Sequence, residues 1–316
     1  MSHRSSFEVI GIGIHAVDIL VRLPEKWRAG EKFLVQELEL QGGGPAATAL
    51  CVCAKLGFSS AFIGRLGDDL MNTIVRDQFT AFGVSTDLLI RDPGARSGMA
   101  LIQVDSQSAE RTIFYNVNGY HFLRPEDLPV TAIRKVKVLL VDGYEPSAVR
   151  HALQLIQKTA CRSILDLDEG EPDQLFELIA LSTDIILPLG CALRLSGCKD
   201  AHSAIESLRK RTKGQLIITD GTNGSWALTN QGVIHQPAFR VKHVDSTGCG
   251  DAFHGGFAVG LLAGWSLELR LEFASWIASI VAQHLGGRGG LPNRKALHEA
   301  DLRLLSKALQ EKIRKL

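Results

Sequence analysis

Short apolar runs separated by helical stretches dominate the chain from about residue 136 onward. The runs VKVLLVDGY, RSILDLD, TDIILPL and GQLIITDG alternate with stretches such as SAVRHALQLIQKT and HSAIESLRKRT. Strands that alternate with helices predict a mostly parallel sheet covered by helices on both faces. Ligands of such sheets bind beyond the carboxyl ends of the strands, so we expect the functional site there.

The first 122 residues carry a different pattern. FEVIGIGIHAVDILV predicts a first strand, and polar–apolar alternation marks residues 31–40 and 97–119, the latter as a hairpin that turns near Ser106 to Ala109. Between these segments, GGGPAATALCVCAKLG and LMNTIVRDQFTAFG predict two helices. Alternation is typical of a half-exposed sheet. We therefore expect residues 1–316 to form a single α/β domain, with about 16–42 and about 96–122 projecting as a small antiparallel lid.

Composition narrows the class of protein. The formal net charge of the 316 residues is +1, which gives no electrostatic reason to expect nucleic acid or an anionic membrane as a partner. No apolar run is long enough to span a bilayer, and the N-terminus lacks the layout of a secretory signal. The six cysteines form no CxxC pair, which is typical of reduced thiols. We therefore expect a cytoplasmic protein.

The stretch DSTGCGDAFHGG, residues 245–256, carries the candidate chemistry. We expect a strand over QPAFRVKHV, a glycine turn and then a helix, so that Gly248, Cys249 and Gly250 lie at a helix N-terminus. Free backbone N–H groups and the helix dipole bind anions there, and glycine lets a phosphate approach closely. Asp251, in the first turn, is placed to accept a proton while the amides stabilise a transferring phosphoryl group. The alternative is an acid that only stabilises the helix dipole.

The string D-[ST]-T-G-[small]-G-D resembles the second signature of the ribokinase-like (PfkB) carbohydrate kinases. Further landmarks cover nearly the whole chain: GIGIHAVD, GGGPAATA, GRLGDD, TDGTNG and GGRGGLP. The resemblance implies a three-layer ribokinase-like fold with a β lid, and ATP with Mg²⁺ as cofactors. It also implies that Asp251 is the base that activates a sugar hydroxyl and that residues 248–250 form the anion hole. The motifs are most similar to the branch of sulfofructose kinase and fructokinase type.

The resemblance also assigns binding residues. On the sugar side it implies Asp18, Gly42, Gly43 and the basic residue Lys32, with Arg96 and Arg111 as either anion binders or solvated lid charges. On the nucleotide side it implies Thr219, Gly221, Gly224, Gly287 and Gly290, with Arg288 either at a phosphate or in solvent. Asp245 and Thr247 match a site for a monovalent cation, K⁺ being the candidate.

Four departures from the family pattern stand out. Ala47 replaces an asparagine that contacts the sugar in ribokinase, and the strand-end arginine of the branch is absent from VLLVDGYEP. The N-x-x-E element that helps to order magnesium is absent from Pro188 to Cys191. Asp166 and Asp168 of LDLDEGE are then either a substitute outer shell for magnesium or solvated loop acids. Cys249 replaces the commoner alanine; a helix N-terminus can lower a cysteine pKa, but the interpretation we favour is a small residue that fills the turn.

The sequence leaves three functions open. The leading one is an ATP-dependent kinase that phosphorylates a primary hydroxyl of a small sugar, a ketose being favoured, under a lid that excludes water. A nucleoside kinase is the second, because the lid is rich in aromatic residues: Phe114, Tyr115, Tyr120 and Phe122. The third is a catalytically weak sugar- or nucleotide-binding protein, suggested by the missing N-x-x-E and opposed by the intact Asp251. Exposed lid edges further suggest a homodimer formed through the lids.

Overall fold

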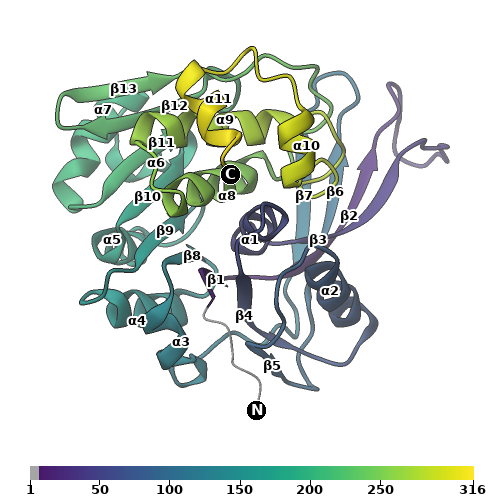
Figure 1. Ribbon diagram of the computed structural model, residues 1–316. Helices are drawn as coiled ribbons and strands as arrows, with labels where there is room; N and C mark the ends of the chain where they lie inside the picture. The colour runs from purple at the N-terminus through teal and green to yellow at the C-terminus, as the bar shows by residue number, and fades with distance from the viewer. Residues whose placement is uncertain (1–6) are drawn as a thin grey trace.

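The computed structural model describes residues 7–316, which form a nine-stranded sheet and a separate four-stranded sheet (Figure 1). The large sheet has the order β13-β12-β11-β10-β9-β8-β1-β4-β5 and is parallel except where β12 joins β11 and β13 joins β12. Its strands are β1 (Val9–Ile12), β4 (Ser60–Leu66), β5 (Leu89–Arg91), β8 (Val138–Asp142), β9 (Arg162–Asp166), β10 (Asp184–Pro188), β11 (Gln215–Thr219), β12 (Ser225–Thr229) and β13 (Gly232–Gln236). This confirms the predicted mostly parallel sheet.

Helices cover both faces of the large sheet. One layer holds α1 (Pro45–Lys55), α2 (Leu70–Ala81), α8 (Cys249–Leu262), α9 (Leu267–Val281), α10 (Arg294–Glu299) and α11 (Lys307–Ile313). The other holds α3 (Val130–Lys135), α4 (Pro146–Ile156), α5 (Pro172–Leu181), α6 (Leu189–Ser196) and α7 (Ala201–Leu208). Successive strand residues enter opposite cores: Val138 and Leu140 pack with α1 and α8, whereas Leu139 and Val141 pack with α4 and α5. The continuous apolar runs are thus explained by burial on both faces.

The small sheet is the lid, and its β2–β3 hairpin projects at the right of Figure 1. Its strands are β2 (Ala16–Arg22), β3 (Leu38–Gly43), β6 (Gly98–Val104) and β7 (Arg111–Asn116), in the order β3-β2-β6-β7. The outer pairs are antiparallel and the central pair, β2 with β6, is parallel. One face of the sheet packs Leu20, Ala100 and Ile102 around Leu285 of the main body. The predicted small sheet is therefore present, with β6 and β7 as its hairpin, although its central pair is parallel rather than antiparallel.

Two of the expected strands are wrong in extent. The first strand is divided at Gly13 to His15 into β1 and β2, which belong to different sheets, because Ile14 N–H bonds to the Asp142 carboxylate instead of continuing a ladder. The strand expected over QPAFRVKHV ends at Gln236. Pro237 has no N–H to continue the pairing, and Val244 N–H bonds to the Ala282 carbonyl at the end of α9. Within residues 7–316, no helix is both long and apolar enough to cross a membrane.

Candidate active site

Two cavities lie at the carboxyl ends of the parallel strands and meet at the glycine turn. The lid cavity, of about 270 Å³, lies between the lid and the strand ends, and its lining includes Asp18, Arg111 and Asp251. The helix cavity, of about 430 Å³, lies between residues 238–246 and helices α8 and α9. Thr219 and Gly250 line both cavities. A group bound in one cavity therefore approaches a group bound in the other beside the first turn of α8.

The glycine turn is held in place by Asp245 and Gly248. Asp245 is fully buried, and its carboxylate accepts hydrogen bonds from Thr247 N–H (2.8 Å), Thr247 Oγ1 (2.7 Å) and Gly286 N–H (2.8 Å). Gly248 caps α8 in the left-handed conformation (φ 71°), and a Cβ there would overlap the backbone of Gly287. The first backbone N–H groups of α8 are thus fixed at the junction of the cavities, where they suit an anion.

Asp251 lies in the first turn of α8 and lines the lid cavity. Burial raises its pKa, while the positive charges near it, first His254 and then Arg111 and Arg288, act in the opposite direction. Arg111 of the lid also reaches the glycine turn, since its Nη1 donates to Ser246 Oγ at 2.7 Å. The structure thus brings Arg111 of the lid together with Asp251 and residues 248–250, a contact that the sequence did not predict.

Asp166 and Asp168, at the end of β9, also line the lid cavity. Asp166 Oδ2 lies 3.3 Å from Nδ1 of the buried His254, and burial together with the charge of Asp251 raises the Asp166 pKa. Arg194 of α6 donates to the Asp168 carbonyl. Among residues 7–316, no three His, Cys, Asp or Glu side chains are grouped so as to hold a metal ion directly.

Asp18 enters the lid cavity from β2, beside the glycine run that ends β3. A Cβ on Gly43 would overlap the Asp18 carboxylate, and one on Gly42 would overlap the guanidinium of Arg288. Gly44 has φ 98°, and a Cβ there would overlap the Ile14 carbonyl. Gly43 thus lies directly against the Asp18 carboxylate, and Gly42 lies against Arg288 on the other face of the strand. The third glycine of the run, Gly44, lines the cavity, and the sequence had not singled it out.

Asp142 lines the lid cavity at the end of β8, and it was not among the site residues predicted from the sequence. Its buried carboxylate accepts from the N–H groups of Ile14 (3.2 Å), Tyr144 (3.0 Å) and Ala46 (3.4 Å). Burial nevertheless raises its pKa to about 8. The signal available in the sequence was an acid directly after the apolar run VLLV, at the edge where ligands bind.

The helix cavity contains the loop residues expected on the nucleotide side. Thr219, Gly221 and Gly224 line it, and Gly224 (φ 91°) has no room for a Cβ beside the Gln236 carbonyl. Its apolar wall is supplied by Phe239, Val241, Phe253, Ala278 and Ala282. The sequence missed this wall, because the segment 237–244 was interpreted as a strand. Gly287 and Gly290 lie nearby, against Gly248 and the His284 ring respectively, rather than in the lining.

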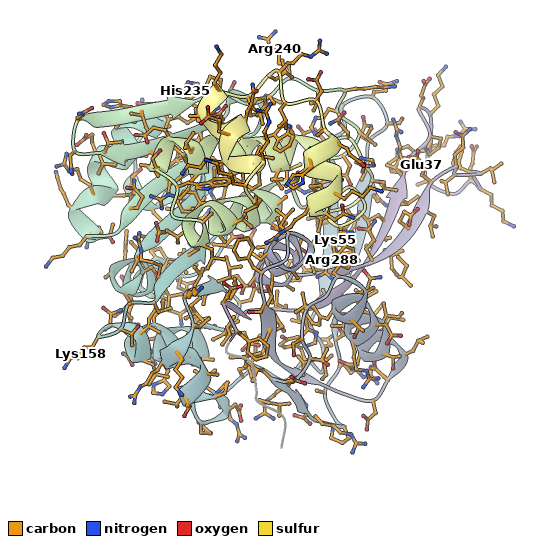
Figure 2. All side chains as sticks on the ribbon, viewed as in Figure 1. Glu37, Lys55, Lys158, His235, Arg240 and Arg288 are labelled. Atoms are coloured by element: carbon orange, nitrogen blue, oxygen red, sulfur yellow. The ribbon has the colours of Figure 1, made fainter. Side chains whose placement is uncertain are left out.

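Other candidates lie elsewhere. Lys32 is exposed in the segment between β2 and β3, on the same projection as Glu37, which Figure 2 labels far from the centre. Arg96 lines a separate hollow on the outer side of the lid with Phe114. Of the lid aromatics, Tyr115 lines the lid cavity, whereas Tyr120 packs against His15 with ring centroids 5.0 Å apart.

The structure departs from the sequence prediction at Arg288 but not at Cys249. Arg288 is neither at the surface nor solvated: it is 3% exposed and lies in the interior near α1 (Figure 2). Cys249 does not have the lowered pKa that a helix N-terminus can produce, because burial raises its pKa to about 12. A thiol with so high a pKa is a poor nucleophile, so Cys249 acts here as a small residue of the turn.

Comparison with known proteins identifies the family and agrees with the fold. The profile of the pfkB family carbohydrate kinases matches residues 7–294. The 5-dehydro-2-deoxygluconokinase of Listeria innocua is 28% identical over 271 residues, which cover 79% of this chain and 83% of that protein. The structure of Arabidopsis thaliana ribokinase with ribose and ATP superposes with a TM-score of 0.78 at 23% identity, over 92% of this chain and 97% of that one. Adenosine kinase from Sinorhizobium meliloti gives 0.78 at 22% identity, over 91% and 98%.

Proposed function

Because the chain belongs to the pfkB family of carbohydrate kinases and is a sugar kinase, we propose that it transfers the γ-phosphoryl group of ATP to a primary hydroxyl of a small sugar or sugar derivative, with a ketose favoured. The observation that carries this proposal is the meeting of the two cavities at Thr219 and Gly250, directly beside Asp251. A sugar in the lid cavity and a nucleotide in the helix cavity would present their reacting atoms to each other there. In-line transfer requires this arrangement.

In this proposal Asp251 is the general base. Its carboxylate accepts the proton of the attacking hydroxyl, and Arg111, reaching the turn from β7, adds positive charge where the phosphoryl group passes. The amides of Gly248, Cys249 and Gly250 stabilise the developing negative charge without reorganising. Asp18 binds and orients the sugar by accepting hydrogen bonds from its hydroxyls.

ATP fits the helix cavity by its chemistry. The apolar wall of Phe239, Val241 and Phe253 suits a purine ring, and the loop of Thr219, Gly221 and Gly224 suits phosphate and ribose. Asp166 and Asp168 would hold Mg²⁺ through its water shell, while the nucleotide phosphates supply its direct ligands. When bound, Mg²⁺ supplies charge neutralisation of the phosphates.

A monovalent cation, K⁺ first among candidates, is proposed beside Asp245 and Thr247. The buried Asp245 carboxylate is bonded to N–H and O–H donors, and within residues 7–316 no basic side chain forms an ion pair with it. Its negative charge is therefore available to a cation that sits against the turn. Dependence of turnover on K⁺ over Na⁺ is the test of this assignment.

The lid has two proposed roles. Residues of about 16–42 and 96–122, within one kinase domain over residues 1–316, close over the sugar and exclude water. The outer face also carries an apolar row across all four strands, because Ile19 pairs with Leu40 and Leu101, and Leu101 pairs with Phe114. Leu40, Leu101 and Phe114 are 45%, 41% and 56% exposed. We propose that the lid of a second copy covers this row in a homodimer.

A nucleoside kinase remains the second candidate, and Tyr115 is the observation that favours it. Its ring lines the lid cavity, where it can stack on a base. Asp18, Asp142 and Asp166 line the same cavity and favour a ligand with many hydroxyl groups instead.

The test is a screen for ADP release with Mg²⁺ and K⁺. Fructose, sulfofructose, 5-dehydro-2-deoxygluconate, fructose 6-phosphate, ribose, 2-keto-3-deoxygluconate and adenosine are compared at equal concentration. We expect turnover on a sugar. Turnover restricted to adenosine would replace this proposal with the second candidate, and ADP release independent of any acceptor would contradict both.

A further inference from the structure

Arg288 is a buried cation in the middle of the molecule. It belongs to the loop after α9, is 3% exposed, and is labelled close to α1 in Figure 2. Its Nη2 donates to the Gly43 carbonyl (3.1 Å) and its Nε to Thr48 Oγ1 (3.2 Å), while its backbone N–H donates to Gln41 Oε1 (3.2 Å). The guanidinium thus ties the loop to β3 and to α1.

The charge of Arg288 is not balanced by an acid in contact with it. Within residues 7–316, no carboxylate lies at ion-pair distance from its guanidinium, in contrast to Arg65 and Arg162, which have such partners. Its carbon lies 5.8 Å and 6.0 Å from the ring centroids of Phe79 and Phe82, which stabilise a cation only modestly. A buried charge without a partner is costly, so its field is expected to act on a charged group nearby.

One acid on which the charge of Arg288 acts is Asp18, which lies on the other side of the Gly42–Gly43 backbone. The Cβ direction of Gly42 points at Arg288 Nη1, and that of Gly43 points at the Asp18 carboxylate. Successive residues of a strand point to opposite faces, so only the backbone of this glycine pair separates the two side chains. Because Gly42 and Gly43 have no side chains, the guanidinium of Arg288 and the carboxylate of Asp18 can each lie directly against the backbone of the strand, on its two faces.

We propose that Arg288 is a positioning residue for sugar binding: its buried guanidinium fixes the Gly42–Gly43 platform and keeps Asp18 charged as a hydrogen-bond acceptor. The sugar-binding part of this role rests on the proposed function, whereas the effect on the charge of Asp18 does not. Burial raises the pKa of Asp18 to about 6, Arg288 opposes that rise, and Asp251 adds to it.

Other charged and titratable groups face Asp18 across the lid cavity. From the lid and β8 these are Arg111, Tyr115, Asp142 and Tyr144. From the end of β9 and from α8 they are Asp166, Asp168, Asp251 and His254. Four of these eight groups are carboxylic acids, and a charged acid raises the pKa of a neighbouring carboxyl, as Asp251 does for Asp18. The cation behind the glycine pair is the one that offsets them from the other side.

The experiment measures the titration of Asp18 in the free protein. Protein labelled with ¹³C at the Asp carboxyl carbons is titrated by NMR, and the Asp18 signal is identified by its loss in Asp18→Asn. We expect Arg288→Met to raise the Asp18 midpoint by about one pH unit, a tenfold change in proton affinity. Arg288→Lys, which keeps the charge, should leave the midpoint within about 0.3 units of the wild type.

Controls separate charge from packing. Arg270→Met removes another largely buried guanidinium, one that stacks on Phe257 and lies 3.7 Å from Asp184, and it should leave the Asp18 midpoint unchanged. If Arg288→Met does not fold, Arg288→Gln keeps an amide donor toward Gly43 and Thr48 and must show the same upward shift. An unchanged midpoint in the neutral variants, or an equal shift in Arg288→Lys, would overturn the inference.

A second readout connects the inference to the sugar. For whichever sugar the wild type binds, calorimetry should give a dissociation constant that Arg288→Met raises about fivefold at pH 6 and far less at pH 8.5, where Asp18 is ionised in both proteins. If Arg288→Met lowered the sugar affinity by the same factor at both pH values, the role of Arg288 would be purely structural. A wild type that binds no sugar, combined with a shifted Asp18 midpoint, would reject the proposed function and leave the charge effect standing.

Discussion

Asp18 and Arg288 lie on opposite faces of the strand end formed by Gly42 and Gly43, and neither glycine leaves room for a Cβ. The carboxylate of Asp18 lines the lid cavity, and the guanidinium of Arg288 is buried behind the two glycines. The glycine run in GGGPAATA is thus explained by side chains on both of its faces, as well as by the positive φ of Gly44. A substitution at either glycine is expected to displace a charged group of the site.

Sugar affinity should fall as the pH is lowered through about 6. The pKa of Asp18 is raised to about 6 by burial, so its acceptor form is lost below that pH. Affinity of the wild type is expected to decrease about tenfold per pH unit well below this midpoint. Calorimetric titration between pH 5 and 8 measures it. Asp18→Asn should bind weakly and with little dependence on pH, and a wild type equally tight at pH 5 and pH 8 would refute the assignment of Asp18.

Gly248→Ala should destabilise the fold by at least about 1 kcal/mol, because Gly248 has a φ of 71° and its Cβ would overlap the Gly287 backbone. Gly250→Ala is the matched control, since a Cβ there meets nothing within 4 Å. Urea unfolding of the two variants gives the comparison. Equal stability of both alanine variants would show that the turn does not depend on the close approach of Gly287.

The free energy of unfolding of the wild type should decline as the pH rises, and Glu145→Gln should remove the part of this decline that Glu145 causes. Glu145 is 1% exposed, its Oε2 accepts from Leu123 N–H at 2.8 Å, and burial raises its pKa from 4.5 to about 8. A raised folded-state pKa favours the folded state at low pH and loses that advantage as the pH rises from 4.5 toward 8. The variant should therefore lose less stability between pH 5 and 8, by up to about 1 kcal/mol per pH unit. Parallel curves of unfolding free energy against pH for the two proteins would contradict this.

Leu101→Glu should convert the proposed homodimer to monomers. The substitution puts a charge in the centre of the apolar row that runs from Leu40 through Ile19 to Phe114. Light scattering on a sizing column measures the mass, and Leu304→Glu, at a residue that is 74% exposed on the C-terminal segment, is the control. A wild type that is monomeric at micromolar concentration would reject the dimer outright.

The sequence predicts the large sheet and the glycine turn well because both depend on local patterns. Leu139 and Leu140 enter different cores, and a run that is apolar at every position is the direct consequence. The turn at Gly248 is likewise predicted from adjacent residues, since only glycine suits the φ of 71°.

Features that depend on distant segments were missed. The change of sheet between β1 and β2 follows from the carboxylate of Asp142, which is 128 positions from Ile14. Arg288 reads as a surface charge in GGRGGLP, and its burial follows from partners more than 200 positions away, Gly43 and Thr48. The apolar wall of the helix cavity was missed because Pro237 prevents a strand that the composition alone suggests.

The central claim is that Asp251 takes the proton of a sugar hydroxyl at the junction of the two cavities. The most direct measurement is single-turnover phosphorylation of the best sugar by Asp251→Asn, with ATP binding measured in parallel. We predict a rate at least about 10³-fold below that of the wild type, with ATP affinity nearly unchanged because Asp251 lines the lid cavity and not the helix cavity. A variant that phosphorylates the sugar within tenfold of the wild-type rate would contradict the claim.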